Sequence, residues 1–184
     1  MNDKIVEIKT QCLKETSQNP IEIVKRLMNI QGISMHGPEH HMIDGAALLT
    51  AVHNAGEHFN LDEALDELAG RGAKMPGATC GQWGICGSAS SVGAALAIIH
   101  ETGPLSNNEY YKDNMRLTSR ILACIGEVGG PRCCKRNAFI ALTTAVNFLR
   151  ERYGMILEYR DVQCDYSKMN MQCIQTQCPF YGKN

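Results

Sequence analysis

Apolar residues recur at helical spacing along most of the chain. Near the N-terminus, Ile5, Ile8 and Cys12 are three and four residues apart, which predicts an amphipathic helix over residues 3–13. The Asn19-Pro20 pair predicts a second helix, ending at Met28, with proline in its first turn. Five more helices are predicted, each followed by glycine or proline: residues 38–54, 61–69, 86–99, 109–127 and 132–152.

The pattern after residue 154 is different. Residues 155–159 favour one short strand, and the rest of the segment is polar and rich in cysteine. The prediction is therefore a mainly α protein: residues 1–184 form a single helical bundle, and residues 155–184 form a small irregular Cys-rich tail packed on it. Residues 88–97 are almost all small, which predicts a central helix closely approached by others, within the chain or across a homodimer.

Charge and apolar composition argue against nucleic-acid and membrane partners. The net charge of −1 gives no general attraction to nucleic acid or to an anionic membrane. The N-terminal residues lack the apolar stretch of a signal peptide, and no apolar run is long enough to span a bilayer. We expect a cytoplasmic protein with neither nucleic acid nor membrane as partner.

The chain contains nine cysteines, which need an explanation. An odd number in an apparently cytosolic protein argues against a full disulfide framework and favours metal ligands, redox thiols or catalytic thiols. Cys12 and Cys124 lie within apolar helical patterns, and we expect both to be buried and inert.

Cys80 and Cys86 flank a glycine-rich loop that leads into a predicted helix. Glycine lets backbone amides approach a sulfide closely, and amide donors tune Fe–S clusters. The loop is therefore a candidate cofactor-binding segment. The alternative is a tight loop with one buried structural cysteine. Trp83 within it is expected to be a core residue.

Cys133 and Cys134 are adjacent, between Arg132 and Lys135-Arg136, at the start of another predicted helix. A helix N-terminus and cationic neighbours both stabilise thiolates. Consecutive helical side chains point about 100° apart, so one cysteine is expected to bind a metal while the other faces a substrate or a second iron. The alternative is a pair packed in the core.

The tail contains Cys164, Cys173 and Cys178, the last followed by proline as in ferredoxin motifs. Three cysteines suit a cluster with one open or non-cysteine ligand, or a zinc ion with its fourth ligand elsewhere. A metal would also staple a tail that has few apolar residues. Asn170 and Gln172 are expected to hydrogen-bond to the site.

Three histidines precede or begin the helix predicted from residue 38. His36 is expected to lie outside the helix and is a candidate metal ligand, while His40 and His41 would occupy its first turn. The two helical histidines are candidates for acid–base catalysis. The alternative is that they are ordinary polar residues near solvent.

Taken together, these motifs resemble a known family. His-Gly-Pro-Glu-His-His at residues 36–41, Cys-Gly at 80–81 and 86–87, Gly-Gly-Pro-Arg-Cys-Cys-Lys-Arg at 129–136 and the tail cysteines are similar to an uncharacterised cysteine-rich domain family of anaerobic bacteria and archaea. Members of that family are sometimes appended to methyltransferase-like domains. The resemblance implies no known activity.

The leading hypothesis is a protein that binds an iron–sulfur cluster, 4Fe-4S in type, with a redox or sulfur- or methyl-related activity on a small molecule. Cys80, Cys86, Cys133 and Cys134 would bind the cluster, while Arg132 and Arg136 would hold an anionic substrate. A methyltransferase or a redox protein would be its partner. The alternatives are a non-enzymatic metal-binding or metal-delivery module, a structural zinc protein, and metal-free thiol–disulfide chemistry at Cys133 and Cys134.

Overall fold

The computed structural model describes residues 2–182 and confirms the mainly α class. In that range it has no β-strand and eight α-helices: α1 (Asn2–Lys14), α2 (Pro20–Met28), α3 (His40–Asn54), α4 (Leu61–Ala73), α5 (Thr79–Gln82), α6 (Gly87–Ile99), α7 (Glu109–Val128) and α8 (Cys134–Tyr153). A short 3₁₀ helix, η1 (Gln175–Gln177), lies in the tail. No helix in residues 2–182 has the length and apolar character needed to cross a membrane.

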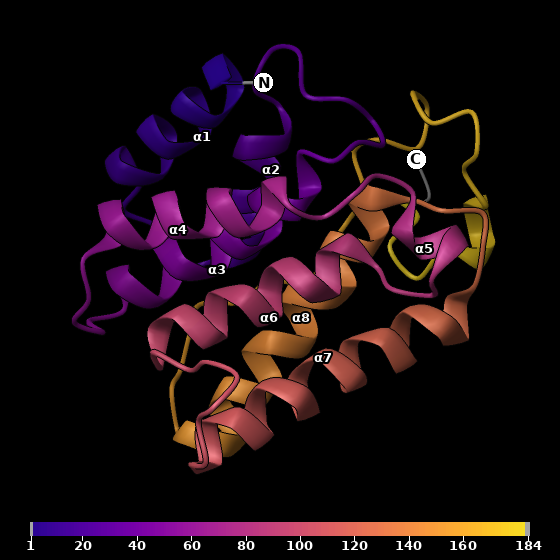
Figure 1. The fold of residues 1–184 in the computed structure, drawn as a ribbon. Helices are drawn as coiled ribbons and strands as arrows, with labels where there is room; N and C mark the ends of the chain where they lie inside the picture. The colour runs from indigo at the N-terminus through magenta and orange to yellow at the C-terminus, as the bar shows by residue number, and fades with distance from the viewer. Residues whose placement is uncertain (1, 183–184) are drawn as a thin grey trace.

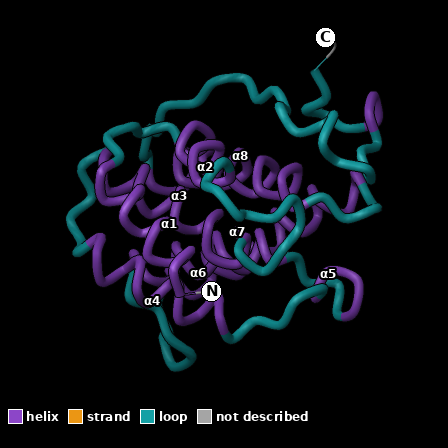
Figure 2. The backbone as a smooth tube through the Cα atoms, turned by 90° about the horizontal axis from the view of Figure 1, so that it is seen from above, coloured by secondary structure: helices purple, strands orange, loops and turns teal. Residues whose placement is uncertain are grey.

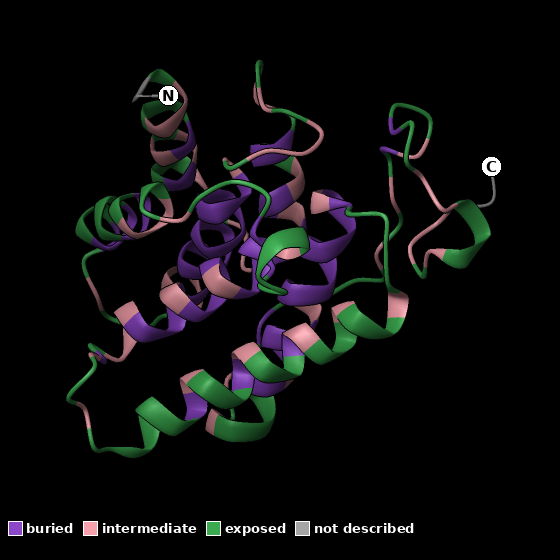
Figure 3. Ribbon diagram, turned by 45° about the vertical axis from the view of Figure 1, so that its right-hand side comes forward, coloured by how far each residue is buried: buried purple, intermediate pink, exposed green. Residues whose placement is uncertain are grey.

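Helices α3, α6 and α8 form the buried centre of the bundle, and α7 covers one side with most of its surface exposed (Figures 1 and 3). The small-residue helix α6 contacts α3, α4, α7 and α8 within the chain. At its crossing with α3, a Cβ atom on Gly45 would overlap the backbone carbonyl of Ser91. The Gly45 amide also donates to the Ser91 hydroxyl at 2.8 Å. Small residues here allow two backbones to approach closely.

Two predictions of secondary structure are wrong, one about where a helix ends and one about a strand. Helix α4 continues through Gly70 and Gly72 to Ala73, because neither glycine adopts the left-handed conformation that ends helices. The predicted strand at residues 155–159 does not form. A strand needs a partner, and the tail offers only an isolated parallel bridge between Cys164 and Tyr181.

The tail packs over the beginning of α8 and against α2. Tyr166 is 4% exposed and stacks near Phe139 of α8, while Phe180 meets the same ring edge-on. Lys25 of α2 donates to the Gln163 carbonyl at 2.7 Å. In Figure 2 the C-terminal part of the tail lies on the same side of the molecule as α5. Residues 183–184, at the end of the predicted tail, lie outside the described range.

Candidate functional site

Two neighbouring cavities lie where α3, α6 and α8 begin. The first, here called the open pocket, has a volume of about 150 Å³. The second, here called the tail cavity, has a volume of about 20 Å³ and lies between α8 and the tail. Helix N-termini present free amides and partial positive charge, which favour anions, whereas burial raises the pKa of Cys134, Cys164 and Cys178.

Seven of the chain's nine cysteines line these two cavities. The open pocket contains three of them, with histidines and an arginine: Cys80, Cys86, Cys134, His36, His40, His41 and Arg132. The tail cavity contains four, with two aromatic rings and an arginine: Cys133, Cys164, Cys173, Cys178, Phe139, Tyr166 and Arg136.

The vicinal pair is split between the two cavities. Cys133 is the N-cap residue of α8, with an extended backbone at φ −142° and ψ 102°, and Cys134 is the first helical residue. The change of backbone conformation between them turns the two side chains apart. Cys133 joins the tail cysteines, and Cys134 joins Cys80 and Cys86. The fourth cysteine of the tail group therefore comes from α8.

Backbone amides point at the sulfurs of the tail cavity. The amide of Tyr166 donates to the Cys164 Sγ, and that of Gln175 to the Cys173 Sγ, each at 3.4 Å. The amide two residues after Cys178, that of Phe180, donates to that sulfur in the same way. Amide hydrogen bonds to sulfur are typical of the surroundings of thiolate ligands.

Cys133 has two donors of its own. The Arg136 amide donates to its Sγ at 3.4 Å, and the Asn170 side-chain amide donates at 3.5 Å. All four sulfurs of the tail cavity therefore accept hydrogen bonds. Among residues 2–182, however, no three His, Cys, Asp or Glu side chains lie close enough together to hold one metal ion.

Two cations are buried beside the tail cavity. Arg136 is 3% exposed, and its guanidinium donates to the carbonyls of Gly129 and Pro131 at 2.6 and 3.0 Å. Lys135 is 2% exposed, and its Nζ lies 5.2 Å from the centre of the Tyr166 ring. Burial lowers the pKa of Lys135, while the charge of Asp44 and the neighbouring cysteines act to raise it. Buried cations of this kind need a nearby anion.

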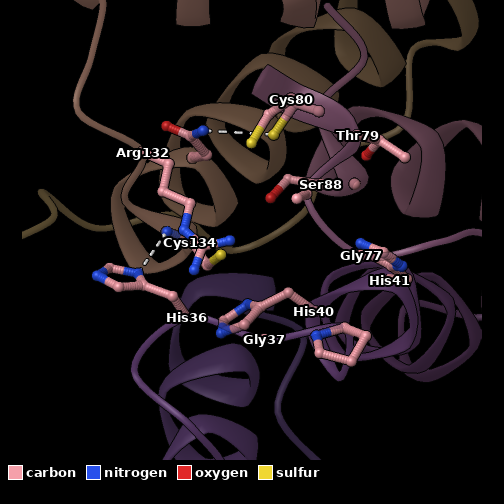
Figure 4. Close-up of a pocket in the computed structure, with 15 residues that line it drawn as sticks. His36, Gly37, His40, His41, Gly77, Thr79, Cys80, Ser88, Arg132 and Cys134 are labelled. Atoms are coloured by element: carbon pink, nitrogen blue, oxygen red, sulfur yellow. Dashed lines mark hydrogen bonds between the residues drawn. The ribbon is translucent and has the colours of Figure 1, made fainter. Parts of the chain in front are cut away.

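The open pocket is bounded by polar groups on several sides. Figure 4 shows Cys80 on one side, with His36 and His40 facing it across the pocket. Arg132 is exposed at the rim, where it is free to meet an anion. Arg136 lines the tail cavity, and its guanidinium donates to the backbone carbonyls of Gly129 and Pro131.

His36 links the two cavities. Its Nδ1 accepts from the Cys134 amide at 3.4 Å, so Nε2 is the donor to the Asn170 side-chain oxygen, 3.2 Å away. Asn170 in turn donates to Cys133. Burial lowers the pKa of His36, against the opposing effect of its hydrogen bond to the Asn170 side-chain oxygen, so the ring is neutral at pH 7. His36 lines the open pocket, whereas Cys164, Cys173 and Cys178 line the tail cavity.

His40 and His41 occupy the first turn of α3 as predicted, but they are buried at 1% and 8% exposure rather than near solvent. His40 Nδ1 meets the buried Asp44 carboxylate at 3.1 Å, and its Nε2 lies 3.4 Å from Lys135 Nζ. His41 Nδ1 lies 3.2 Å from the Met75 carbonyl, so it is the donor. Burial lowers the pKa of His41.

The thiols of the open pocket differ in their surroundings. The Asn137 side chain donates to the Cys86 Sγ at 3.3 Å. Burial raises the pKa of Cys134 to about 11, although a hydrogen bond from Gly37 lowers it in part. Cys80, on the short helix α5, is only half-buried.

Sequence reasoning missed two residues of this region and misjudged two others. Asn137 and Asp44 carry no motif, and only the fold shows that Asn137 contacts Cys86 and that Asp44 contacts His40. Trp83 is 60% exposed rather than in the core, and Cys124 is exposed rather than buried. Asn170 was identified correctly as a hydrogen-bonding residue, and Gln172 donates its amide to the Asn170 side chain.

Fold and site together define a helical protein with two cysteine-lined cavities at converging helix N-termini. The chain belongs to the family of unknown function DUF5714, whose model matches residues 8–181. No curated protein and no solved structure matches the chain.

Proposed function

We propose that the protein binds an iron–sulfur cluster of the 4Fe-4S type and acts on a small molecule in redox or sulfur- or methyl-related chemistry. The observation that carries the proposal is the group of four cysteines around the tail cavity, all with hydrogen bonds to sulfur: Cys133, Cys164, Cys173 and Cys178. Four cysteine thiolates are the usual ligands of such a cluster.

A zinc ion and a cluster need different spacings of their four sulfurs. A tetrahedral zinc site with Zn–S bonds of about 2.3 Å brings its sulfurs within about 3.8 Å of one another. Among the described residues, no three His, Cys, Asp or Glu side chains are close enough to hold a single metal ion. A cubane cluster holds each thiolate on a different iron and therefore separates them more widely.

Charge supports the same proposal. A cluster with four thiolate ligands is a net anion, and Arg136 and Lys135 are buried cations beside the place where it would bind. Arg136 has no carboxylate partner among the described residues. An anionic cluster would offset the cost of burying that charge.

The open pocket is the proposed substrate site. Its three thiols, its histidines and the exposed Arg132 suit a small molecule with an anionic group and a soft atom such as sulfur. The Asn170–His36 link joins this pocket to the cluster ligand Cys133. A redox protein or a methyltransferase is the proposed partner, the latter from the resemblance of the motifs alone.

Anaerobic purification followed by absorbance spectroscopy and by iron, sulfide and zinc analysis tests the proposal. We expect a broad band near 400 nm and about four iron and four sulfide per chain. Cys164→Ser and Cys173→Ser should lose the band. Cys124→Ser, at an exposed thiol outside both cavities, is the matched control and should keep it.

Cys80→Ser distinguishes the two possible ligand sets. It should keep the band if the tail cavity holds the cluster, and a loss of iron in this variant would return Cys80 and Cys86 to the ligand set. A colourless protein with one zinc per chain would overturn the proposal and identify a structural zinc protein.

A further inference from the structure

The two cysteines of the glycine loop are brought together by the backbone. The Ile85 amide donates to the Thr79 carbonyl at 3.4 Å, which closes the loop and places the following residues, Cys80 and Cys86, beside each other. Left-handed conformations at Ala78 and Gly84 allow the tight return. Both cysteines line the open pocket, and both also line the groove between α5 and α7.

The two thiols of this pair differ in access. Cys80 is half-buried on α5, whereas Cys86 is 7% exposed and receives the hydrogen bond from Asn137. An accessible thiol beside a shielded one is the arrangement needed for attack on a disulfide followed by intramolecular resolution. Trp83 and Ile85, on the same loop, are also exposed.

A short hydrogen-bonded route connects this pair with the tail cavity. Asn137 donates to the Cys86 Sγ, and the preceding residue, Arg136, donates its amide to the Cys133 Sγ. Two consecutive residues of α8 therefore touch a thiol of each cavity. Cys86 and the proposed cluster ligand Cys133 therefore contact neighbouring residues of α8.

We propose that Cys80 and Cys86 form a redox-active dithiol that reduces a small disulfide bound in the open pocket. The Cys80 thiolate attacks one sulfur of the substrate, forming a mixed disulfide and releasing one thiolate, which takes a proton from water. Cys86 then attacks the Cys80 sulfur, and its proton goes to the second departing thiolate. The products are two substrate thiols and a Cys80–Cys86 disulfide.

Regeneration of the two thiols from the Cys80–Cys86 disulfide rests on the cluster proposed above. The disulfide takes up two electrons and two protons to return to two thiols. A cluster held by Cys133, Cys164, Cys173 and Cys178 would supply these electrons one at a time, from a low-potential one-electron carrier protein or from a chemical reductant such as dithionite.

The test uses the anaerobic, iron-loaded protein and hydroxyethyl disulfide as substrate. After stoichiometric addition, free thiols are blocked with N-ethylmaleimide and the peptides are mapped by mass spectrometry. We expect a Cys80–Cys86 disulfide and two released thiols. In Cys86→Ser the mixed disulfide should accumulate on Cys80, and in Cys80→Ser no disulfide should form in this loop. Cys124→Ser is the control and should behave like the unchanged protein.

Other linkages would overturn the proposal. A Cys86–Cys134 disulfide, or a mixed disulfide confined to Cys124, would show that the glycine loop is not a redox pair. A Cys80–Cys86 disulfide in protein without iron would support the pair while the cluster proposal fails, since iron and sulfide are measured on the same sample. In iron-loaded protein, dithionite should reopen the disulfide, and an unchanged disulfide would exclude electron transfer from the cluster.

Discussion

At the scale of single residues, the local environment of a cysteine, rather than its sequence pattern, determines whether it is buried and which cavity it lines. Cys12 and Cys124 have similar apolar neighbours in the sequence, yet the first is completely buried and the second is exposed. Cys133 and Cys134 are adjacent, yet they line different cavities because one caps α8 and the other begins it. Neither difference is encoded by residue type or spacing, since each depends on the dihedral angles and packing of a particular helix.

The contrast between Cys12 and Cys124 gives a prediction about reactivity. Burial raises the pKa of Cys12 to about 11, so its thiol stays protonated, and therefore unreactive, until the pH approaches that value. Iodoacetamide at mildly alkaline pH should label Cys124 in the folded protein and leave Cys12 unmodified, as read by peptide mass spectrometry. Labelling of Cys12 should rise with pH.

The same protein in guanidinium chloride is the control, because unfolding exposes both thiols and should make their labelling similar. Equal labelling rates in the folded protein would contradict the burial of Cys12.

At the scale of helices and loops, the sequence predicts most elements, because helical spacing and glycine or proline stops are local signals. The sequence pattern fails where the structure of a segment depends on residues that are distant in the chain. The segment over residues 155–159 has strand-like composition but meets no strand, and the four-residue helix α5 is too short for a periodic pattern. The tail cavity is likewise invisible in the sequence, because its fourth cysteine comes from α8.

The crossing of α3 and α6 gives a prediction about packing. Gly45→Ala places a methyl group against the Ser91 backbone, which must move, and should destabilise the protein by about 1–3 kcal/mol. Gly126→Ala is the control, because a Cβ there has nothing within 4 Å, and in a helix it should stabilise by about 0.5–1 kcal/mol. Denaturant midpoints measure both changes, and equal midpoints for the two variants would contradict a tight crossing.

At the scale of the whole molecule, the tail depends on few contacts with the bundle. Leu157, Tyr166 and Asn170 are its buried residues, and most of the other side chains between residues 155 and 182 are partly or fully exposed. So little burial gives weak anchoring, and a cluster joined to Cys133 would supply a covalent link between tail and bundle.

This weak anchoring gives a prediction about proteolysis. After removal of the cluster with a chelator and an oxidant, trypsin should cleave quickly at Arg160 and Lys168, which are exposed in the tail, and leave the helical bundle intact. Gel electrophoresis with mass spectrometry follows the cleavage. Lys14, exposed at the end of α1, provides an internal reference whose cleavage should not change. Equal rates at Arg160 before and after removal would show that the cluster does not hold the tail.

Because one site is divided between α8 and the tail, it is complete only after the tail has been synthesised. The helices through Tyr153 precede the tail during synthesis, and early segments fold first on the ribosome. Cys133 is already positioned at that stage, because its sulfur accepts the Arg136 amide within α8 itself. The remaining three cysteines follow in the tail. If this cavity holds the proposed cluster, iron delivery follows the synthesis of the tail, and its acceptor is a helical bundle that has already folded.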